Sequence, residues 1–155
     1  KILFNKNSDV LNKLTDTLLY LAARNENFIN NIKPFYKKKI IISDRFADST
    51  IAYQHYGFGI NKNLINMVHK NILNKVEADF TFLMKIDINE SFKRLKKRSK
   101  LNRYDQFSKI YYKNVQDGFI KLSNLQPRKY MIINSKNSIT INKKIIFQKF
   151  LEQIK

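Results

Sequence analysis

Apolar residues recur every three or four positions between residues 10 and 32, which is the spacing of one face of an α-helix. The pattern predicts a long amphipathic helix over residues 10–32, ending near Pro34 because proline cannot continue a helix. A second helical stretch is expected to reach Tyr53 and to end at the glycine turn that follows. Further helices with the same spacing are predicted over residues 64–76, 91–98, 107–125 and 139–154.

Three short apolar runs lie between these helices, at residues 40–42, 80–86 and 130–133. Continuous apolar runs of this length are typical of strands that are buried on both faces of a parallel sheet. Helices that alternate with such strands predict an α/β fold with a parallel sheet flanked by helices. Ligands of these sheets bind beyond the carboxyl ends of the strands, which here carry Ser43, Asp44, Arg45, Asp87, Asn134 and Ser135.

The charge of the chain is strongly positive, with 30 Lys and Arg against 12 Asp and Glu and a net charge of +18. Because 24 of the 30 basic residues are lysines scattered along the chain, coding bias explains much of this charge. A basic stripe interleaved with stacking aromatics is missing, so we expect no specific nucleic-acid partner. A phosphorylated small molecule fits the charge equally well, and the six arginines suit bidentate phosphate recognition better than the lysines do.

Composition excludes several other classes of protein. The 155 residues suffice for one domain with a buried core, and 43% hydrophobic residues argue against disorder. The absence of cysteine excludes disulfides and thiolate metal sites, and two isolated histidines leave little basis for a transition-metal site. No apolar run approaches the roughly 20 residues of a membrane span. We therefore expect a globular protein of the cytoplasm that is not bound to a membrane.

Asp44 and Arg45 are the first candidates for chemistry, because they follow the apolar run at 40–42. A carboxylate after a strand can lie beside Mg²⁺ in phosphoryl-transfer enzymes, and an adjacent arginine can bind phosphate oxygens. These two residues alone fit a structural role equally well, with Asp44 capping the next helix and Arg45 as a surface charge.

Longer segments resemble the thymidylate (dTMP) kinase family, in order and over nearly the whole chain. They are LLYLAAR (18–24), IKPFYKKKIIISDRF (32–46), DSTIAYQ (48–54), EADFTFLMKID (77–87), KRLKKRSKLNRYD (93–105) and DGFIKL (117–122). The resemblance implies a P-loop NTPase-like parallel sheet over a single domain, residues 1–155. It also implies transfer of the γ-phosphoryl group of ATP to dTMP, with Mg²⁺ as cofactor and with dTDP as product.

The resemblance implies a role for each matching residue of the acceptor site. Tyr20 matches the aromatic ring that stacks on the thymine base, and Arg24 matches the arginine that binds the pyrimidine carbonyl edge. Asp44 and Arg45 match the catalytic Asp-Arg pair near the metal and the phosphate, with Asp44 reaching Mg²⁺ indirectly or through water. The remaining matches to the dTMP site are Ser49, Thr50, Tyr53 and Gln54. Without the resemblance, the alternative interpretation is that Tyr20 is a core aromatic of an amphipathic helix and that Arg24 is an ordinary solvated charge.

Residues 99–106 resemble the mobile lid that closes over ATP in this family. The resemblance implies that Arg94, Arg98 and Arg103 reach the ATP phosphates, and that Arg98 and Arg103 also act in catalysis. A closing basic segment excludes water and places positive charge beside the transferring phosphates. The alternative is a solvated basic helix end, which suits the intervening lysines.

The chain departs from the family pattern at several positions. Its three glycines cannot form the phosphate loop G-x-x-x-x-G-K-[ST], so we expect that roughly a quarter of the enzyme, its N-terminal strands and phosphate loop, lies ahead of Lys1. Phe58 and Asn102 stand where the family usually has arginine and aspartate.

Two expectations follow for the whole protein. We expect these 155 residues alone to lack kinase activity, and the complete enzyme to form a homodimer through helices that include 18–24. Two alternatives remain open, another deoxynucleoside or nucleotide kinase of the same fold and a non-catalytic basic binding module.

Overall fold

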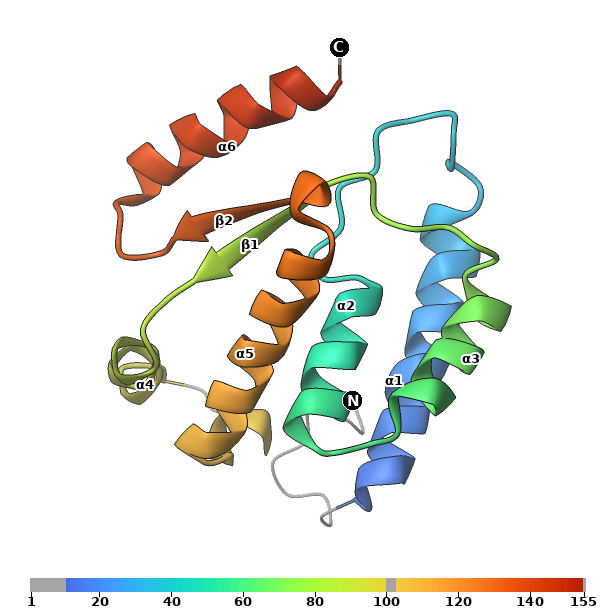
Figure 1. The fold of residues 1–155 in the computed structure, drawn as a ribbon, viewed down its shortest axis with the longest axis horizontal. Helices are drawn as coiled ribbons and strands as arrows, with labels where there is room; N and C mark the ends of the chain where they lie inside the picture. Colours follow the sequence, from blue (N-terminus) through green and yellow to red (C-terminus); the bar gives the residue numbers. More distant parts are fainter. Residues whose placement is uncertain (1–10, 100–102, 155) are drawn as a thin grey trace.

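The computed structural model describes residues 11–99 and 103–154, which form helices around a short parallel sheet (Figure 1). Helix α1 passes directly into the π-helical turn η2, and α2 passes in the same way into η3. The elements in chain order are α1 (Lys13–Asn27), η2 (Phe28–Ile32), α2 (Ala47–Thr50), η3 (Ile51–Gly57), α3 (Lys62–Ile72), β1 (Thr81–Lys85), α4 (Ile88–Lys96), η4 (Arg103–Gln106), α5 (Lys109–Leu125), η5 (Pro127–Lys129), β2 (Tyr130–Asn134) and α6 (Ile139–Gln153).

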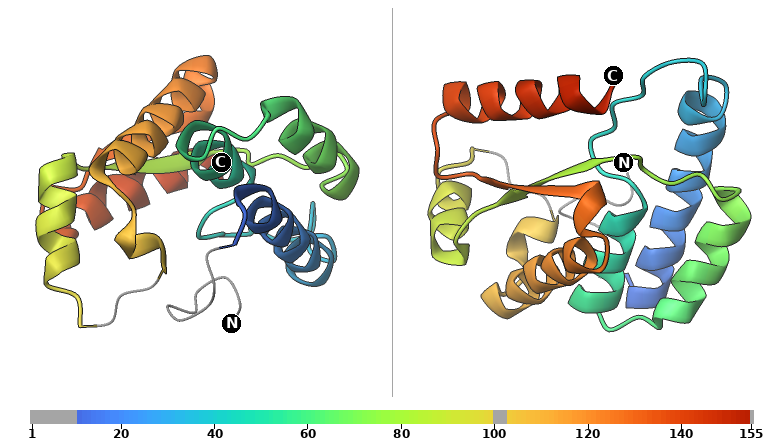
Figure 2. Two further views of the ribbon diagram at one scale, coloured as in Figure 1. Left: turned by 90° about the horizontal axis from the view of Figure 1, so that it is seen from below. Right: turned by 45° about the horizontal axis from the view of Figure 1, so that its top comes forward.

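The sheet contains β1 and β2, which pair in parallel from Thr81 opposite Tyr130 to Lys85 opposite Asn134. Helices α4 and α5 lie between the two strands in the sequence, as a parallel connection requires. Helix α6 covers one side of the sheet and α5 the other, and α1, α2 and α3 stand together beyond α5 (Figures 1 and 2). The predicted α/β architecture with a helix-flanked parallel sheet is therefore confirmed.

The strand expected at residues 40–42 is not formed, and this prediction was wrong. Residues 40–43 belong to no helix or strand, and Ile40 and Ile42 are 62% and 85% exposed instead of buried. A strand exists only through its backbone bonds to a neighbour, and within the described residues β1 pairs with β2 alone. An apolar run shows that a segment is suited to the interior of a sheet. It forms a strand only where a neighbouring strand is present to accept and donate its backbone hydrogen bonds.

The polypeptide around residues 46–53 connects the two apolar clusters of the described chain. Phe46 and Ala47 pack against one cluster, whose buried members are Phe28, Ile32 and Leu73. Ala52 belongs to the other cluster, together with Tyr111 and Val115 of α5. Contacts on both sides hold α2 and η3 in place, so their side chains form a rigid platform.

Helix α5 and η3 approach closely because each has a glycine at the contact. A Cβ atom on Gly118 would lie 2.5 Å from Cδ2 of Tyr56, and a Cβ atom on Gly57 would lie 2.6 Å from Cε2 of Tyr111. Both distances are too short for a real contact, so only glycine permits this packing.

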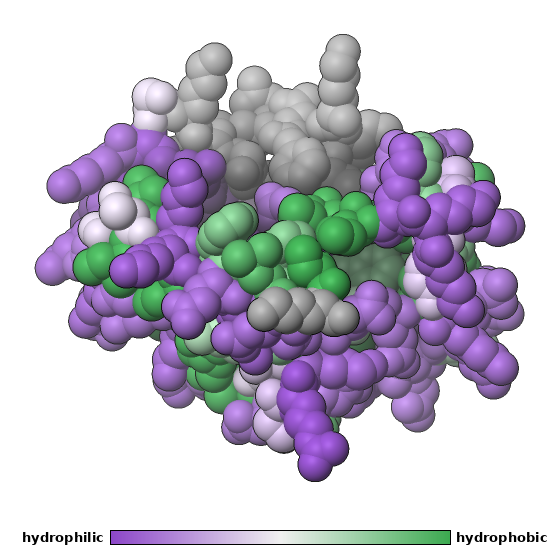
Figure 3. Space-filling view, turned by 90° about the horizontal axis from the view of Figure 1, so that it is seen from above, coloured by the Kyte–Doolittle hydropathy of each residue, from purple (hydrophilic) through white to green (hydrophobic). Residues whose placement is uncertain are grey.

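The face that Figure 3 shows is largely hydrophilic and carries an apolar area near its centre. Large apolar side chains that are exposed in the described chain include Ile42, Met84, Ile132 and Phe147. Among the described residues, no helix combines the length and apolar character needed to cross a membrane.

Candidate functional site

Helix α1 carries Tyr20 and Arg24 one turn apart, so both side chains lie on the same face of the helix. Asn12 caps the helix by accepting a hydrogen bond from the backbone N–H of Leu14 at 2.8 Å. The guanidinium of Arg24 crosses to the next element, where its Nε donates to Oγ1 of Thr50 at 3.1 Å. The α1 face and the end of α2 are therefore joined by a polar side-chain contact.

Arg24 is a partly buried cation. Burial lowers its pKa to about 10, and the nearby carboxylate of Asp48 acts in the opposite direction. The guanidinium also lies 5.8 Å from the centre of the Phe46 ring, a cation–π distance. Asp48 is itself held in place by the Tyr130 hydroxyl, which donates to its Oδ2 atom. At neutral pH, Arg24 thus remains a charged donor.

Asp44 and Arg45 stand at the surface just ahead of α2. Arg45 has a φ angle of 72°, in the left-handed region that non-glycine residues seldom adopt. The Ser43 hydroxyl donates to the backbone carbonyl of Arg45 at 2.9 Å and supports this bend. Rare backbone conformations cluster at functional sites, where the surrounding structure maintains them.

The side chain of Arg45 turns back onto Tyr53, with its guanidinium carbon 4.9 Å from the ring centre. Ser49, Thr50 and Gln54 are buried on the same short helical run, and Tyr53 is half buried. The run changes from α-helix to π-helix after Thr50. Such π-helical turns are rare and often mark functional sites.

Tyr104 is a member of the site that the sequence did not identify. Its ring meets Tyr20 edge-on at 5.7 Å and Tyr53 at 6.4 Å. Its hydroxyl donates to Oδ2 of the buried Asp16 at 2.5 Å. Nothing in the sequence links Asp16 to a residue 88 positions away, so Tyr104 could not be assigned to the site in advance. The sequence showed only that Asp16 and Tyr20 are one helical turn apart and therefore share a face of the helix.

Three further residues near Arg24 were also missed. Asp48 and Tyr130 form the hydrogen bond described above, between α2 and the first residue of β2. His69 of α3 is 8% exposed, and its Nε2 atom has no hydrogen-bond partner within the described part of the chain. Burial lowers the pKa of His69 to about 4, and the Arg24 charge lowers it further in the same direction.

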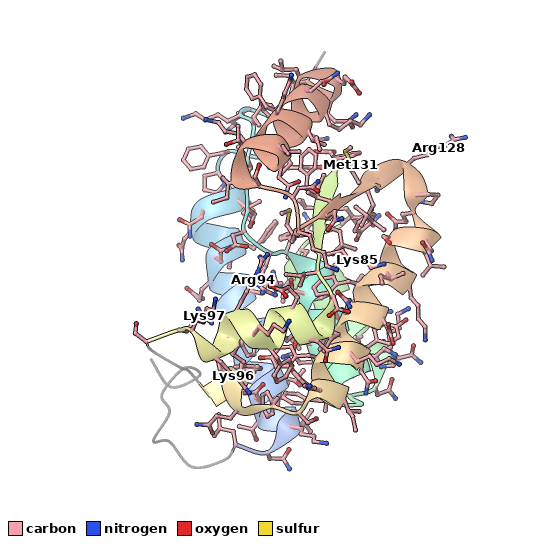
Figure 4. All side chains as sticks on the ribbon, turned by 90° about the vertical axis from the view of Figure 1, so that its left-hand side faces the viewer. Lys85, Arg94, Lys96, Lys97, Arg128 and Met131 are labelled. Carbon is pink, nitrogen blue, oxygen red and sulfur yellow. The ribbon has the colours of Figure 1, made fainter. Side chains whose placement is uncertain are left out.

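The predicted lid arginines have protein partners in this structure. Arg94 donates to the backbone carbonyl of Ser135 at 3.0 Å, and Arg98 pairs with the carboxylate of Asp105 at 3.2 Å. Figure 4 shows Arg94 with Lys96 and Lys97 on α4, and Lys85 at the end of β1. The Arg103 side chain and residues 100–102 lie outside what the structure describes, so the predictions for Arg103, Lys100 and Asn102 are untested.

Arg94 also borders a groove of about 640 Å³ beside the start of α6. The groove is partly lined by Ser135, Ser138, Asn142 and Lys143. Its position beyond the carboxyl ends of β1 and β2 is the edge at which parallel sheets bind ligands.

The structure brings together Tyr20, Arg24, Thr50, Tyr53 and Arg45 through the contacts given above. Arg94 and Arg98 bind other parts of the chain. Asp44 does not cap α2, whose N-cap is Phe46, so the alternative structural role for this carboxylate does not hold. Asp87 caps α4 instead, accepting from Asn89 and Glu90.

Phe58 packs against the rings of Tyr104, Phe107 and Tyr111. An arginine at this position would be surrounded by aromatic rings. The departure from the family pattern at Phe58 is therefore a core aromatic that supports η3.

Comparisons with known proteins identify relatives of this chain. A family model described as thymidylate kinase matches residues 2–146. The thymidylate kinase of Ehrlichia chaffeensis (strain ATCC CRL-10679 / Arkansas) is 40% identical over 128 residues, which cover 82% of this chain and 61% of that protein. The thymidylate kinase of Mesoplasma florum (strain ATCC 33453 / NBRC 100688 / NCTC 11704 / L1) is 33% identical, with 96% of this chain and 74% of that protein covered.

A crystal structure of thymidylate kinase from Ehrlichia chaffeensis superimposes with a TM-score of 0.72 at 30% identity, covering 93% of this chain and 68% of that one. The chain thus spans about three fifths of the length of the first of these relatives. Sequence and structure agree on the P-loop NTPase fold. This chain belongs to the thymidylate kinase family.

Proposed function

We propose that the protein containing this chain transfers the γ-phosphoryl group of ATP to dTMP, giving dTDP, and that the described residues form the dTMP site. One observation carries the proposal: an aromatic ring, Tyr20, and a partly buried cation, Arg24, share one helix face beside the polar residues of α2 and η3. A flat ring and a fixed planar donor match the face and the carbonyl edge of a pyrimidine.

Tyr20 stacks on the base, and Arg24 donates from its remaining N–H groups to the base carbonyl. The bond from Arg24 to Thr50 fixes the orientation of the guanidinium before the nucleotide arrives. A donor that is already oriented loses little entropy on binding, and it discriminates against bases whose edge presents a donor. This pair therefore supplies the preference for thymine.

The sugar and phosphate extend along α2 and η3. Tyr53 lies against the sugar, and Ser49 and Gln54 are the small polar contacts of the same run. Arg45 holds the α-phosphate of dTMP, and its backbone bend turns the guanidinium toward the Tyr53 ring. Phosphoryl transfer depends on positioning and charge neutralisation, and this set of residues provides both without a nucleophile.

Asp44 is the residue that would hold Mg²⁺. Its carboxylate is exposed beside Arg45, and within the described residues no cluster of three acidic or histidine side chains offers a closed metal cage. A single hard oxygen ligand fits Mg²⁺, which keeps several waters and binds through one or two carboxylates together with phosphates. When bound, the ion neutralises charge on the transferring phosphoryl group.

ATP is the proposed phosphate donor, and the lid arginines are its proposed contacts. In this structure the Arg98 guanidinium pairs with the carboxylate of Asp105. A phosphate of ATP is also an anionic partner for a guanidinium, so Arg98 releases Asp105 and binds the phosphate instead. Arg94 lies at the groove beside α6 and stays a nucleotide contact at the carboxyl edge of the sheet. Arg103 completes the set as a proposal from the sequence alone.

A homodimer in the cytoplasm remains part of the proposal. Leu14 and Leu18 are one helical turn apart on α1 and are 43% and 48% exposed. They lie on the opposite side of α1 from Tyr20, so a second copy can cover them without closing the nucleotide site. Analytical ultracentrifugation of a Leu18→Glu variant tests this interface.

The test of the function is steady-state kinetics of the full encoded polypeptide with dTMP, dCMP and dGMP. We expect dTMP to be preferred, and Arg24→Ala to weaken its use about ten- to a hundred-fold because the base edge loses its buried donor. Arg128→Ala is the matched control, since Arg128 is an exposed arginine away from the site and its loss should change little. Equal use of all three nucleotides would refute the thymine assignment.

A further inference from the structure

Tyr104 joins α1 to η4, which lies within the lid segment predicted over residues 99–106. It lies in η4, it is 7% exposed, and its hydroxyl donates to Oδ2 of Asp16 at 2.5 Å. Asp16 is 2% exposed, so the bond is formed almost entirely out of water. Short hydrogen bonds from a hydroxyl to a buried carboxylate are among the stronger ones in proteins.

The Tyr104 hydroxyl is bonded to the helix that carries the side chain assigned to the base. A carboxylate only accepts, so the proton of Tyr104 points to Asp16. Because Asp16 and Tyr20 are one turn apart on α1, this bond restrains the Tyr104 ring at the helix face that carries Tyr20.

Ring packing restrains Tyr20 in the same way. The two rings meet edge-on, with an interplanar angle of 81°. The ring of Tyr104 also contacts Tyr53, at 6.4 Å and 73°, so one side chain touches both tyrosines of the proposed dTMP site. A stacking ring contributes fully to affinity only when its plane is fixed before the ligand binds.

We propose that Tyr104 is a positioning residue, whose hydroxyl, anchored on Asp16, fixes the plane of the Tyr20 ring that receives the nucleotide base. The proposal rests on the assignment of Tyr20 to base stacking under the proposed function. It also makes η4, the described end of the predicted lid segment, part of base recognition, because η4 carries the residue that orients the Tyr20 ring.

A second hydroxyl allows this role to be separated from simple anchoring of η4. Tyr112 of α5 donates to the backbone carbonyl of Tyr104 at 2.7 Å. It therefore holds the same segment without touching Tyr20. Tyr104→Phe and Tyr112→Phe each remove one hydroxyl and keep the ring, which makes them a matched pair.

The experiment measures kcat, the KM for dTMP and the KM for ATP in the full encoded polypeptide and these two variants. Tyr104→Phe should raise the KM for dTMP about tenfold, with kcat and the KM for ATP within about twofold. Tyr112→Phe should lower the melting temperature but leave the KM for dTMP unchanged. In a Tyr20→Ala background, Tyr104→Phe should have little further effect on this KM, because the ring that Tyr104 positions is already gone.

Equal effects of the two variants on the KM for dTMP, or effects of Tyr20→Ala and Tyr104→Phe that simply add, would overturn the proposal. NMR of ring-labelled tyrosine tests it independently of catalysis. Tyr104→Phe should speed the ring flipping of Tyr20 or shift its ring signals, and Tyr112→Phe should not. If no dTDP forms but this NMR difference appears, the proposed function fails, while the contact between Tyr104 and Tyr20 stands. If the Tyr20 signals are unchanged in Tyr104→Phe, the contact itself is refuted.

Discussion

The buried His69 side chain makes the stability of this protein dependent on pH in a calculable way. Its ring is 8% exposed, its Nε2 atom lacks a hydrogen-bond partner among the described residues, and the cation of Arg24 acts on it from α1. Burial lowers the pKa of His69 from 6.5 to about 4, and Arg24 adds to that decrease. The imidazole is therefore neutral in the folded protein at neutral pH.

The direction of the effect follows from proton binding. Between about pH 6.5 and about pH 4, the unfolded chain binds a proton at His69 that the folded protein does not, so stability falls as the pH falls. The full gap corresponds to about 3 kcal/mol, of which about 1.4 kcal/mol is lost at pH 5.5 and about 2 kcal/mol at pH 5. Above about pH 7 this contribution no longer changes.

The measurement is urea unfolding of the wild type and of His69→Leu at about pH 7.5, 6.5, 5.5 and 5. The variant should gain on the wild type by these amounts as the pH falls, because leucine cannot bind the proton. His55→Gln is the control, since the ring of His55 already bonds the Ile60 carbonyl at 2.8 Å, and this variant should keep the acid sensitivity that His69 causes. A difference between wild type and His69→Leu that stays constant across the whole range would refute the reasoning.

Two further predictions concern packing and charge. Gly118→Ala should destabilise the protein by about 1–3 kcal/mol in denaturant unfolding, because its methyl group would overlap Tyr56. Asn114→Ala, at an exposed position of α5, should not destabilise the protein. Equal unfolding midpoints for the two variants would contradict the close contact of α5 and η3. The charge of +18 should give only weak binding to DNA, lost between about 50 and 200 mM salt, and tight sequence-selective binding in a salt titration at physiological ionic strength would contradict a small-molecule role.

Local periodicity predicted those elements whose stability depends on their own pattern. The helix predicted over residues 10–32 is found as α1 and η2, which span residues 13–32, and the apolar runs at 80–86 and 130–133 contain β1 and most of β2. The run at 40–42 failed because a strand depends on a neighbour, and within the described residues none lies beside it. Periodicity reports a tendency of one segment, and it carries no information on which segments meet.

The same distinction, between patterns within one segment and contacts between segments, applies to the residues of the candidate site. The helical spacing of Tyr20 and Arg24 and the order of polar residues from Asp44 to Gln54 were readable, because those residues are close in the sequence. Contacts between distant segments were not readable. Tyr104 and Asp16 are 88 positions apart and Tyr130 and Asp48 are 82 apart, so their hydrogen bonds depend on the completed fold.

A crystal structure of the full encoded polypeptide with dTMP tests the central claim most directly. The account predicts the thymine ring against Tyr20, a base carbonyl within hydrogen-bond distance of the Arg24 guanidinium, and the phosphate beside Arg45. A nucleotide whose base lies away from α1, for example in the groove beside α6, would contradict it.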